Sequence, residues 1–171
     1  VQSGTSHGGV VLADGSIADV ALDFDTLRDL SRVARDEYGM AGAVQHGAST
    51  LPDGAFNNFP KTETAEIHLA TNFQNMLYDA MPSELREEMY EWLRVNAKDE
   101  RKAGDTDEQF FYKSRKKAIG PFKQALWDMT DADRERLGRA YDEKFGFLFE
   151  QLGVGGTKPA VLKYVQAPEQ R

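Results

Sequence analysis

The stretch Ala43-Val44-Gln45-His46-Gly47-Ala48-Ser49-Thr50 begins as an apolar run and ends in a histidine, a glycine and two hydroxyl residues. The run predicts a buried strand, and Leu51-Pro52-Asp53-Gly54 behind it predicts a loop. In parallel sheets and barrels, ligands bind where strands end. An imidazole there can hold a metal, and a glycine lets the backbone approach an anion such as phosphate. The alternative is a histidine that only hydrogen-bonds its neighbours at a strand–loop junction.

A similar pattern occurs at the start of the chain. Residues 1–9 read VQSGTSHGG, a short strand-like lead that ends in His7-Gly8. Between the two His-Gly pairs, Asp25 is a candidate N-cap for a helix over about residues 26–38, which Gly39 ends. The apolar face of that helix consists of Leu27, Leu30, Val33 and Ala34. Strand, helix and strand in this order predict a βαβ unit with parallel strands.

A third strand is predicted over residues 64–71 (TAEIHLAT), with His68 near its end, followed by a helix over 72–81. Residues 53–59 predict a short helix that Pro60 stops. Each of the three strands thus carries one of the three histidines of the chain. In a parallel barrel, such strand ends can converge on one metal ion. Alternatively, each histidine has a structural role only.

The sequence becomes helical in character from Pro82 onward. One helix is capped by Ser83, a second covers about residues 107–119, and a third runs from the capping box Thr130-x-x-Asp133 to about Leu152. The tail carries one apolar cluster, Val161, Leu162, Tyr164 and Val165. The predicted organisation is therefore an α/β part over 1–81, a helical extension over 82–153 and a tail over 154–171.

Composition excludes several classes of function. The chain has 171 residues, which predicts one domain or a fragment of a larger protein. A net charge of −7 argues against nucleic acid or an anionic membrane as partner. Cysteine is absent, so any metal must be held by His, Asp or Glu. No signal peptide is visible, which predicts a cytoplasmic protein, and a start at Val1 within a strand predicts further chain upstream.

The run Lys113-Ser114-Arg115-Lys116-Lys117 is a basic island in this acidic chain. One interpretation is a solvated helix face. The other is phosphate binding, because a guanidinium matches phosphate in a forked geometry. A second set of phosphate-binding candidates stands at the strand ends, with hydroxyl groups and backbone N–H groups from Gly8, Gly47, Ser49 and Thr71. Ordinary turn chemistry is the alternative for that set.

Four motifs, in order and with fitting spacing, resemble the class II (metal-dependent) fructose-bisphosphate aldolases and related ketose-bisphosphate aldolases. The resemblance covers roughly residues 1–125 and corresponds to the C-terminal part of the family's chain. The motifs are Ser6-His7-Gly8, His46-Gly47-Ala48-Ser49, His68-Leu69-Ala70-Thr71 and the segment 114–121 (SRKKAIGP).

The resemblance implies a TIM barrel, of which this chain supplies the last three β/α units before a long helical extension. It implies that His7 and His46 are zinc ligands. One substrate phosphate would bind Gly8, Gly47, Ser49, Ala70 and Thr71, with a monovalent cation near Gly8, Gly47 and Ser49 in some members. Arg115 would contact the other phosphate across a subunit boundary, which implies a homodimer or higher homo-oligomer. The catalytic Asp and a further zinc ligand would lie upstream.

The implied reaction is reversible aldol cleavage of fructose 1,6-bisphosphate to dihydroxyacetone phosphate and glyceraldehyde 3-phosphate. His68 stands where the family has an asparagine, which predicts a substrate-facing role for it, and Ala70 offers only its backbone. The chain alone should carry part of the site and should not turn over. Two alternatives remain: another metal-dependent barrel enzyme, such as a tagatose-bisphosphate aldolase or a hydrolase, and a non-catalytic module in which the helical region drives assembly.

Overall fold

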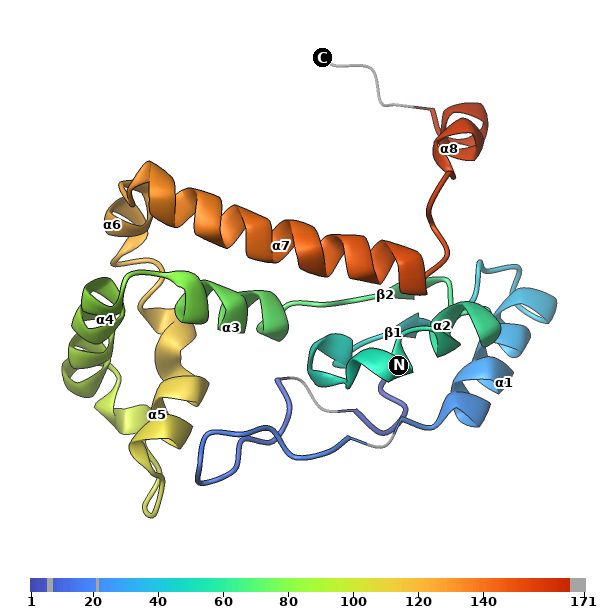
Figure 1. The fold of residues 1–171 in the computed structure, drawn as a ribbon. Helices are drawn as coiled ribbons and strands as arrows, with labels where there is room; N and C mark the ends of the chain where they lie inside the picture. Colours follow the sequence, from blue (N-terminus) through green and yellow to red (C-terminus); the bar gives the residue numbers. More distant parts are fainter. Residues whose placement is uncertain (6–7, 21, 167–171) are drawn as a thin grey trace.

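The computed structural model describes residues 1–5, 8–20 and 22–166, and this part is mostly helical with a small parallel sheet (Figure 1). The sheet contains β1 (Val44–Gln45) and β2 (Glu66–Ile67). Val44 pairs with Glu66 and Gln45 with Ile67 in parallel register. This mixed architecture is compatible with the predicted α/β class.

The N-terminal segment lies on the other side of β1. The Val1 amino group donates to the Val44 carbonyl at 2.7 Å, and the His46 N–H donates to the Val1 carbonyl at 2.9 Å. Two bonds that bracket one residue of the neighbour are the pattern of a parallel ladder. The N-terminal segment, β1 and β2 therefore lie side by side in chain order, and their C-terminal ends reach the same edge.

Helix α1 (Phe24–Asp36) connects the first two segments, and it begins earlier than predicted. Its N-cap is Asp23 rather than Asp25, because an Asp23 carboxylate oxygen accepts the Thr26 N–H at 2.9 Å. Asp25 instead forms an ion pair with Arg28 at 2.7 Å. Of the apolar face predicted for this helix, Leu27 is fully buried, whereas Leu30 is exposed to solvent.

Three short helical turns join β1 to β2: η1 (Ala48–Thr50), η2 (Asp53–Ala55) and α2 (Asn58–Lys61). Pro60 lies inside α2 and does not stop it, because the first turn of a helix has no internal acceptor for its N–H groups. The predicted third strand shortens to Glu66–Ile67. β1 ends before this point, and the chain continues into η1. Leu69 and Ala70 therefore have no neighbouring strand with which to form hydrogen bonds.

The remainder of the chain is helical, as predicted, with different boundaries. The Ser83 hydroxyl is not a cap, because Ser83 is already the first helical residue behind Pro82. The helix predicted over 107–119 ends at Ser114 and continues as a 3-10 turn. The elements are α3 (Thr71–Ala80), α4 (Ser83–Asn96), η3 (Lys98–Glu100), α5 (Asp107–Ser114), η4 (Arg115–Lys117), α6 (Lys123–Trp127), α7 (Asp131–Gln151) and α8 (Lys158–Tyr164).

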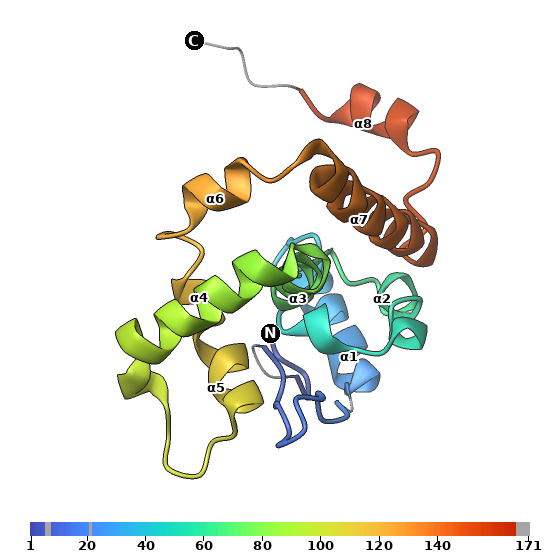
Figure 2. The same cartoon turned by 60° about the vertical axis from the view of Figure 1, so that its left-hand side comes forward.

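Two hydrophobic clusters hold these elements together. One joins α3 with α4 and α5 through residues such as Tyr78, Leu93 and Phe110. The other packs α1 and the β1–α2 region against Leu148 of α7. Helix α7 also runs along α3 in both views (Figures 1 and 2), where the Tyr141 hydroxyl donates to the Phe73 carbonyl at 3.0 Å. Both clusters therefore combine residues from either side of Pro82.

The tail predicted to form an apolar cluster is helix α8. It stands apart from the other helices in both views (Figures 1 and 2). Its side chains are exposed, with Leu162 at 73% and Tyr164 at 74%. Among the described residues, no helix is both long and apolar enough to cross a membrane.

The Asp23 cap supports a stability prediction. Hydrogen bonds from the Thr26 N–H and hydroxyl lower the pKa of Asp23 below its usual value of 3.8. A carboxyl whose pKa is lowered on folding contributes stability above its unfolded pKa, and this contribution is lost as the pH falls through the folded pKa. Asp23→Ala should therefore lower the melting temperature at neutral pH, and the difference from wild type should shrink below about pH 4.

Circular-dichroism melts between pH 7 and pH 3 test this expectation. Asp36→Ala is the matched control, because Asp36 lies in the last turn of the same helix and should not stabilise it. A difference between Asp23→Ala and wild type that stays constant with pH would contradict the capping role.

Candidate functional site

A pocket of about 500 Å³ lies at the C-terminal ends of the parallel segments. We call it the strand-end pocket. It is formed by the loop after the N-terminal segment, the residues after β1, the residues after β2 and the first turn of α3. Its lining consists of Gly8, His46, Gly47, Ser49, Ile67, His68, Leu69, Ala70 and Thr71. Apart from Arg115, every predicted site residue within the described ranges lines this pocket.

Two imidazoles lie side by side in the strand-end pocket. The ring centroids of His46 and His68 are 4.3 Å apart, because parallel pairing places the two residues behind adjacent strands. His46 is half-buried, whereas the His68 side chain is 47% exposed and contacts the Glu66 carboxylate. Nitrogen donors of this kind suit zinc. In the described ranges, no three His, Asp or Glu side chains are arranged to hold a metal, and His7 lies outside those ranges.

The opposite wall of the strand-end pocket favours anions. Helix α3 begins at Thr71, and its N-cap Ala70 supplies no side-chain acceptor for the first N–H groups. The Ser49 hydroxyl accepts the Ala70 N–H at 2.6 Å, which joins the β1 loop to the start of α3. Unpaired N–H groups and the helix dipole make such a terminus attractive to phosphate.

Two glycines complete this wall. Gly8 and Gly47 have φ values of 80° and 71°, in the left-handed region that strains other residues. A Cβ on Gly8 would lie 3.8 Å from the Thr71 hydroxyl, on the side of the pocket where α3 begins. Glycine at these positions therefore leaves the backbone open to an anion in front of α3.

Gln45 holds the residues of the site together through hydrogen bonds, and this role was not predicted from the sequence. This fully buried side chain accepts the Ser3 hydroxyl at 2.9 Å. It donates to the Thr5 hydroxyl at 3.0 Å and to the His46 carbonyl at 2.8 Å. It thereby ties the N-terminal segment to the backbone of His46. The available signal was one polar residue in an apolar strand, since a buried amide needs partners.

Arg115 does not reach the strand-end pocket. Only 8% of it is exposed, and its guanidinium donates to the Asn75 side chain on α3. The guanidinium carbon lies 5.2 Å from the ring centre of Tyr78 and 4.5 Å from that of Tyr112. The Tyr78 hydroxyl donates to the Arg115 carbonyl at 2.7 Å, and burial raises the pKa of that phenol. Within this chain, Arg115 contacts residues of both α3 and α5.

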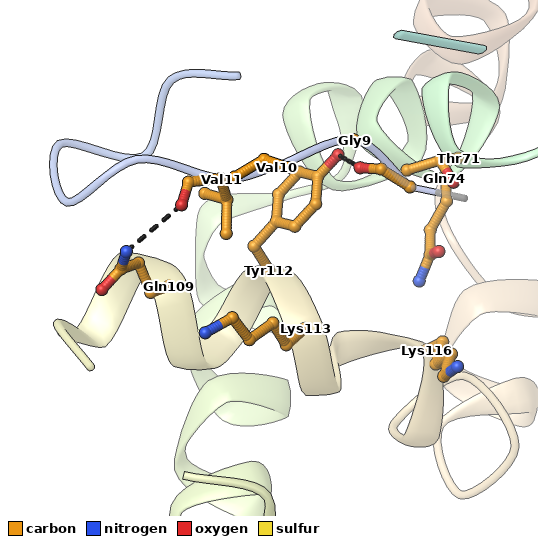
Figure 3. A pocket seen from close by; sticks show the side chains of 10 residues that line it. Gly9, Val10, Val11, Thr71, Gln74, Gln109, Tyr112, Lys113 and Lys116 are labelled. Atoms are coloured by element: carbon orange, nitrogen blue, oxygen red, sulfur yellow. Dashed lines mark hydrogen bonds between the residues drawn. The ribbon is translucent and has the colours of Figure 1, made fainter. Parts of the chain in front are cut away.

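A second pocket, of about 630 Å³, lies between α3 and α5 (Figure 3). We call it the α3–α5 pocket. It shares Gly8 and Thr71 with the strand-end pocket, so the two are adjacent. Its remaining lining residues are Gly9, Val10, Val11, Gln74, Gln109, Tyr112, Lys113 and Lys116.

One face of α5 fastens the loop that carries Gly8. Thr106, Gln109 and Tyr112 are spaced three residues apart and therefore share a helix face. Their side chains donate to the carbonyls of Ala13 at 3.0 Å, Val11 at 3.2 Å and Gly8 at 2.7 Å, respectively. Figure 3 shows the Gln109 and Tyr112 side chains directed at this loop. The helical region thus builds a wall of the candidate site.

No protein-family model matches the chain, and no curated protein or solved structure matches it.

The Gln45 network predicts a large effect of a nearly isosteric change. Gln45→Leu should lower the free energy of unfolding by about 1–3 kcal/mol, because buried polar groups of Ser3 and His46 lose their partner. Urea denaturation measures the change. Gln124→Leu is the matched control, since Gln124 is exposed on α6 and should tolerate leucine. Equal stability of the two variants would contradict the proposed role of Gln45.

Proposed function

We propose that this chain carries part of the active site of a zinc-dependent aldolase, which cleaves a ketose 1,6-bisphosphate reversibly. Fructose 1,6-bisphosphate is the proposed substrate, with dihydroxyacetone phosphate and glyceraldehyde 3-phosphate as products. One observation carries the proposal: residues from three separate motifs, which the sequence assigns to metal and phosphate binding, line a single pocket. They are Gly8, His46, Gly47, Ser49, His68, Ala70 and Thr71.

The phosphate next to the ketone is placed against the α3 wall. Backbone N–H groups of Gly8, Gly47 and the first residues of α3 would bind the anion, and the Ser49 hydroxyl accepts the Ala70 N–H and so fixes the position of Ala70. Binding through backbone groups and a helix terminus needs no lysine or arginine. It also fixes one end of the substrate, which orients the bond to be cleaved.

The residues of this chain would provide part of the ligand set of a zinc ion. His46 and His7 would hold it, and the two-ligand set would be completed by a residue on the preceding strands. When bound, zinc polarises the substrate ketone as a Lewis acid. In the described part, the contribution of the chain is to hold His46 in place, through the Gln45 hydrogen bond to its carbonyl.

His68 faces the same pocket and is proposed to contact substrate. The Glu66 carboxylate contacts its Nε2. The other ring nitrogen remains for a hydrogen bond to a substrate oxygen. By the sequence resemblance, His68 corresponds to an asparagine of the family, so a ring nitrogen would take the place of an amide.

We also propose that the chain is part of a TIM barrel. Three parallel segments in chain order, with helices between and behind them, fit the last β/α units of a TIM barrel. The acid–base Asp would lie upstream, so the isolated chain should bind phosphate without turning over. Assembly as a homodimer or higher oligomer would bring Arg115 to the far phosphate of a neighbouring site.

The reaction is tested with the full-length protein. Cleavage of fructose 1,6-bisphosphate should stop with a chelator and return with zinc. His46→Ala should lower both zinc content and activity by at least about 100-fold, because a metal ligand is lost. Chelator-resistant cleavage would contradict the proposal. Zinc binding without cleavage of this sugar would point to another ketose phosphate, with tagatose 1,6-bisphosphate tested next.

The phosphate wall is tested separately with inorganic phosphate. Ser49→Ala should raise its dissociation constant about 10-fold, because the start of α3 loses its anchor to the β1 loop. Isothermal titration calorimetry measures the affinity. Ser16→Ala is the control, since Ser16 hydrogen-bonds only within the distant turn at Asp14. Unchanged affinity in Ser49→Ala would place the phosphate elsewhere.

A further inference from the structure

Helix α8 has an apolar face that nothing in the described part of the chain covers. The helix has seven residues and stands apart from the other helices in both views (Figures 1 and 2). Val161, Leu162 and Val165 share one of its faces, and all three are exposed. An isolated helix shorter than about 12 residues is only marginally stable in water. A helix this short, with an open apolar face, needs a surface on which to pack.

The connection between α7 and α8 directs α8 away from its own α7. The Val154 N–H donates to the Phe149 carbonyl at 3.1 Å, and the Thr157 hydroxyl donates to the Val154 carbonyl at 2.7 Å. Gly153 and Gly156 have φ values of 64° and 73°, which this path requires. Folding α8 back onto its own α7 would break these hydrogen bonds. The connection therefore presents α8 to a second molecule.

Helix α7 has an exposed apolar stripe of matching kind. Phe145 and Phe149 are 41% and 53% exposed, and their ring centroids lie 6.0 Å apart. Gly146 lies between them in the sequence, and a Cβ on it would meet no atom within 4 Å. We call Phe145, Gly146 and Phe149 the α7 stripe. The open space at Gly146 lets a second helix approach α7 closely.

The surroundings of the α7 stripe are acidic. Asp142, Glu143 and Glu150 lie within one turn of it, are exposed, and form no ion pair within the described residues. The basic side chains nearby are already paired: Lys144 with Asp53, and Arg139 with Glu135. The α7 stripe therefore favours an apolar partner that carries positive charge.

Helix α8 has this complementary character. It carries Lys158 and Lys163 and no acidic residue, and neither lysine pairs with a carboxylate of the described residues. We propose that α8 of one molecule packs on the α7 stripe of a second copy of this chain, and that the second copy returns the contact. Because one chain carries both surfaces, an exchange about a two-fold axis covers both at once. The inference does not depend on the proposed function.

Disulfide cross-linking of the full-length protein tests the exchange, because these 171 residues contain no cysteine. Copies with Gly146→Cys are mixed, under mild oxidation, with differently tagged copies with Val161→Cys. A mixed disulfide-linked dimer should form, because the two positions meet across the proposed interface. Asp99→Cys in place of Gly146→Cys is the matched control, since Asp99 is exposed on η3 and should give only background.

Charge reversal tests the complementarity. Adding Lys158→Glu and Lys163→Glu to the Val161→Cys copies should slow cross-linking at least about 10-fold at low salt, because attraction becomes repulsion. Adding Glu143→Lys and Glu150→Lys to the Gly146→Cys copies should then restore the rate. In that mixture, each α8 again meets a stripe of opposite charge.

Three results would overturn the exchange. The first is no mixed dimer above the Asp99→Cys background, and the second is a rate that charge reversal does not change. The third is a disulfide within single chains, and no mixed dimer, when Gly146→Cys and Val161→Cys are combined in one chain, because α8 would then pack on its own α7. None of these results bears on zinc or phosphate binding. Circular dichroism of the variants establishes that their helices are retained.

Discussion

Parallel pairing around Gln45 is the constraint on which the site depends. Hydrogen bonds from Val1 on one side and the β2 ladder on the other fix the register of β1. Since register decides which residue leaves the sheet first, His46 and His68 emerge side by side and the start of α3 faces them. A slip of one residue would turn both imidazoles away from the pocket. The buried Gln45 amide opposes that slip, because its partners exist only in this register.

The helical region has a part in this arrangement. Helix α7 covers α3 through the Phe73 and Phe145 rings, stacked 4.9 Å apart, while Arg115 holds α3 from the α5 side. The three donors of α5 then fix the Gly8 loop against the same helix. The position of α3, and therefore of its N-terminus, is set by packing from residues far later in the chain. This favours a role for these helices in ligand binding over a role in assembly alone.

Much of this arrangement was predictable from residues that lie close together in the sequence. The turn at Gly47, the helix before β1, the helix after Thr130, and the grouping of residues around His46 follow from local patterns and from parallel strand order. Contacts between distant segments were not predictable. No local pattern shows that Tyr112 reaches Gly8 or that Arg115 turns to Asn75, because both depend on how α5 packs against α3. The third strand was predicted too long for the same reason, since its length is set by its partner β1.

The most direct test of this account is the position of zinc and phosphate in the full-length protein. A crystal structure with a ketose bisphosphate bound, with anomalous diffraction recorded at the zinc edge, measures both. The account predicts a zinc peak beside His46 and a phosphate between Gly8, Gly47 and the first turn of α3. A zinc ion away from His46, or a phosphate bound away from the start of α3, would contradict it.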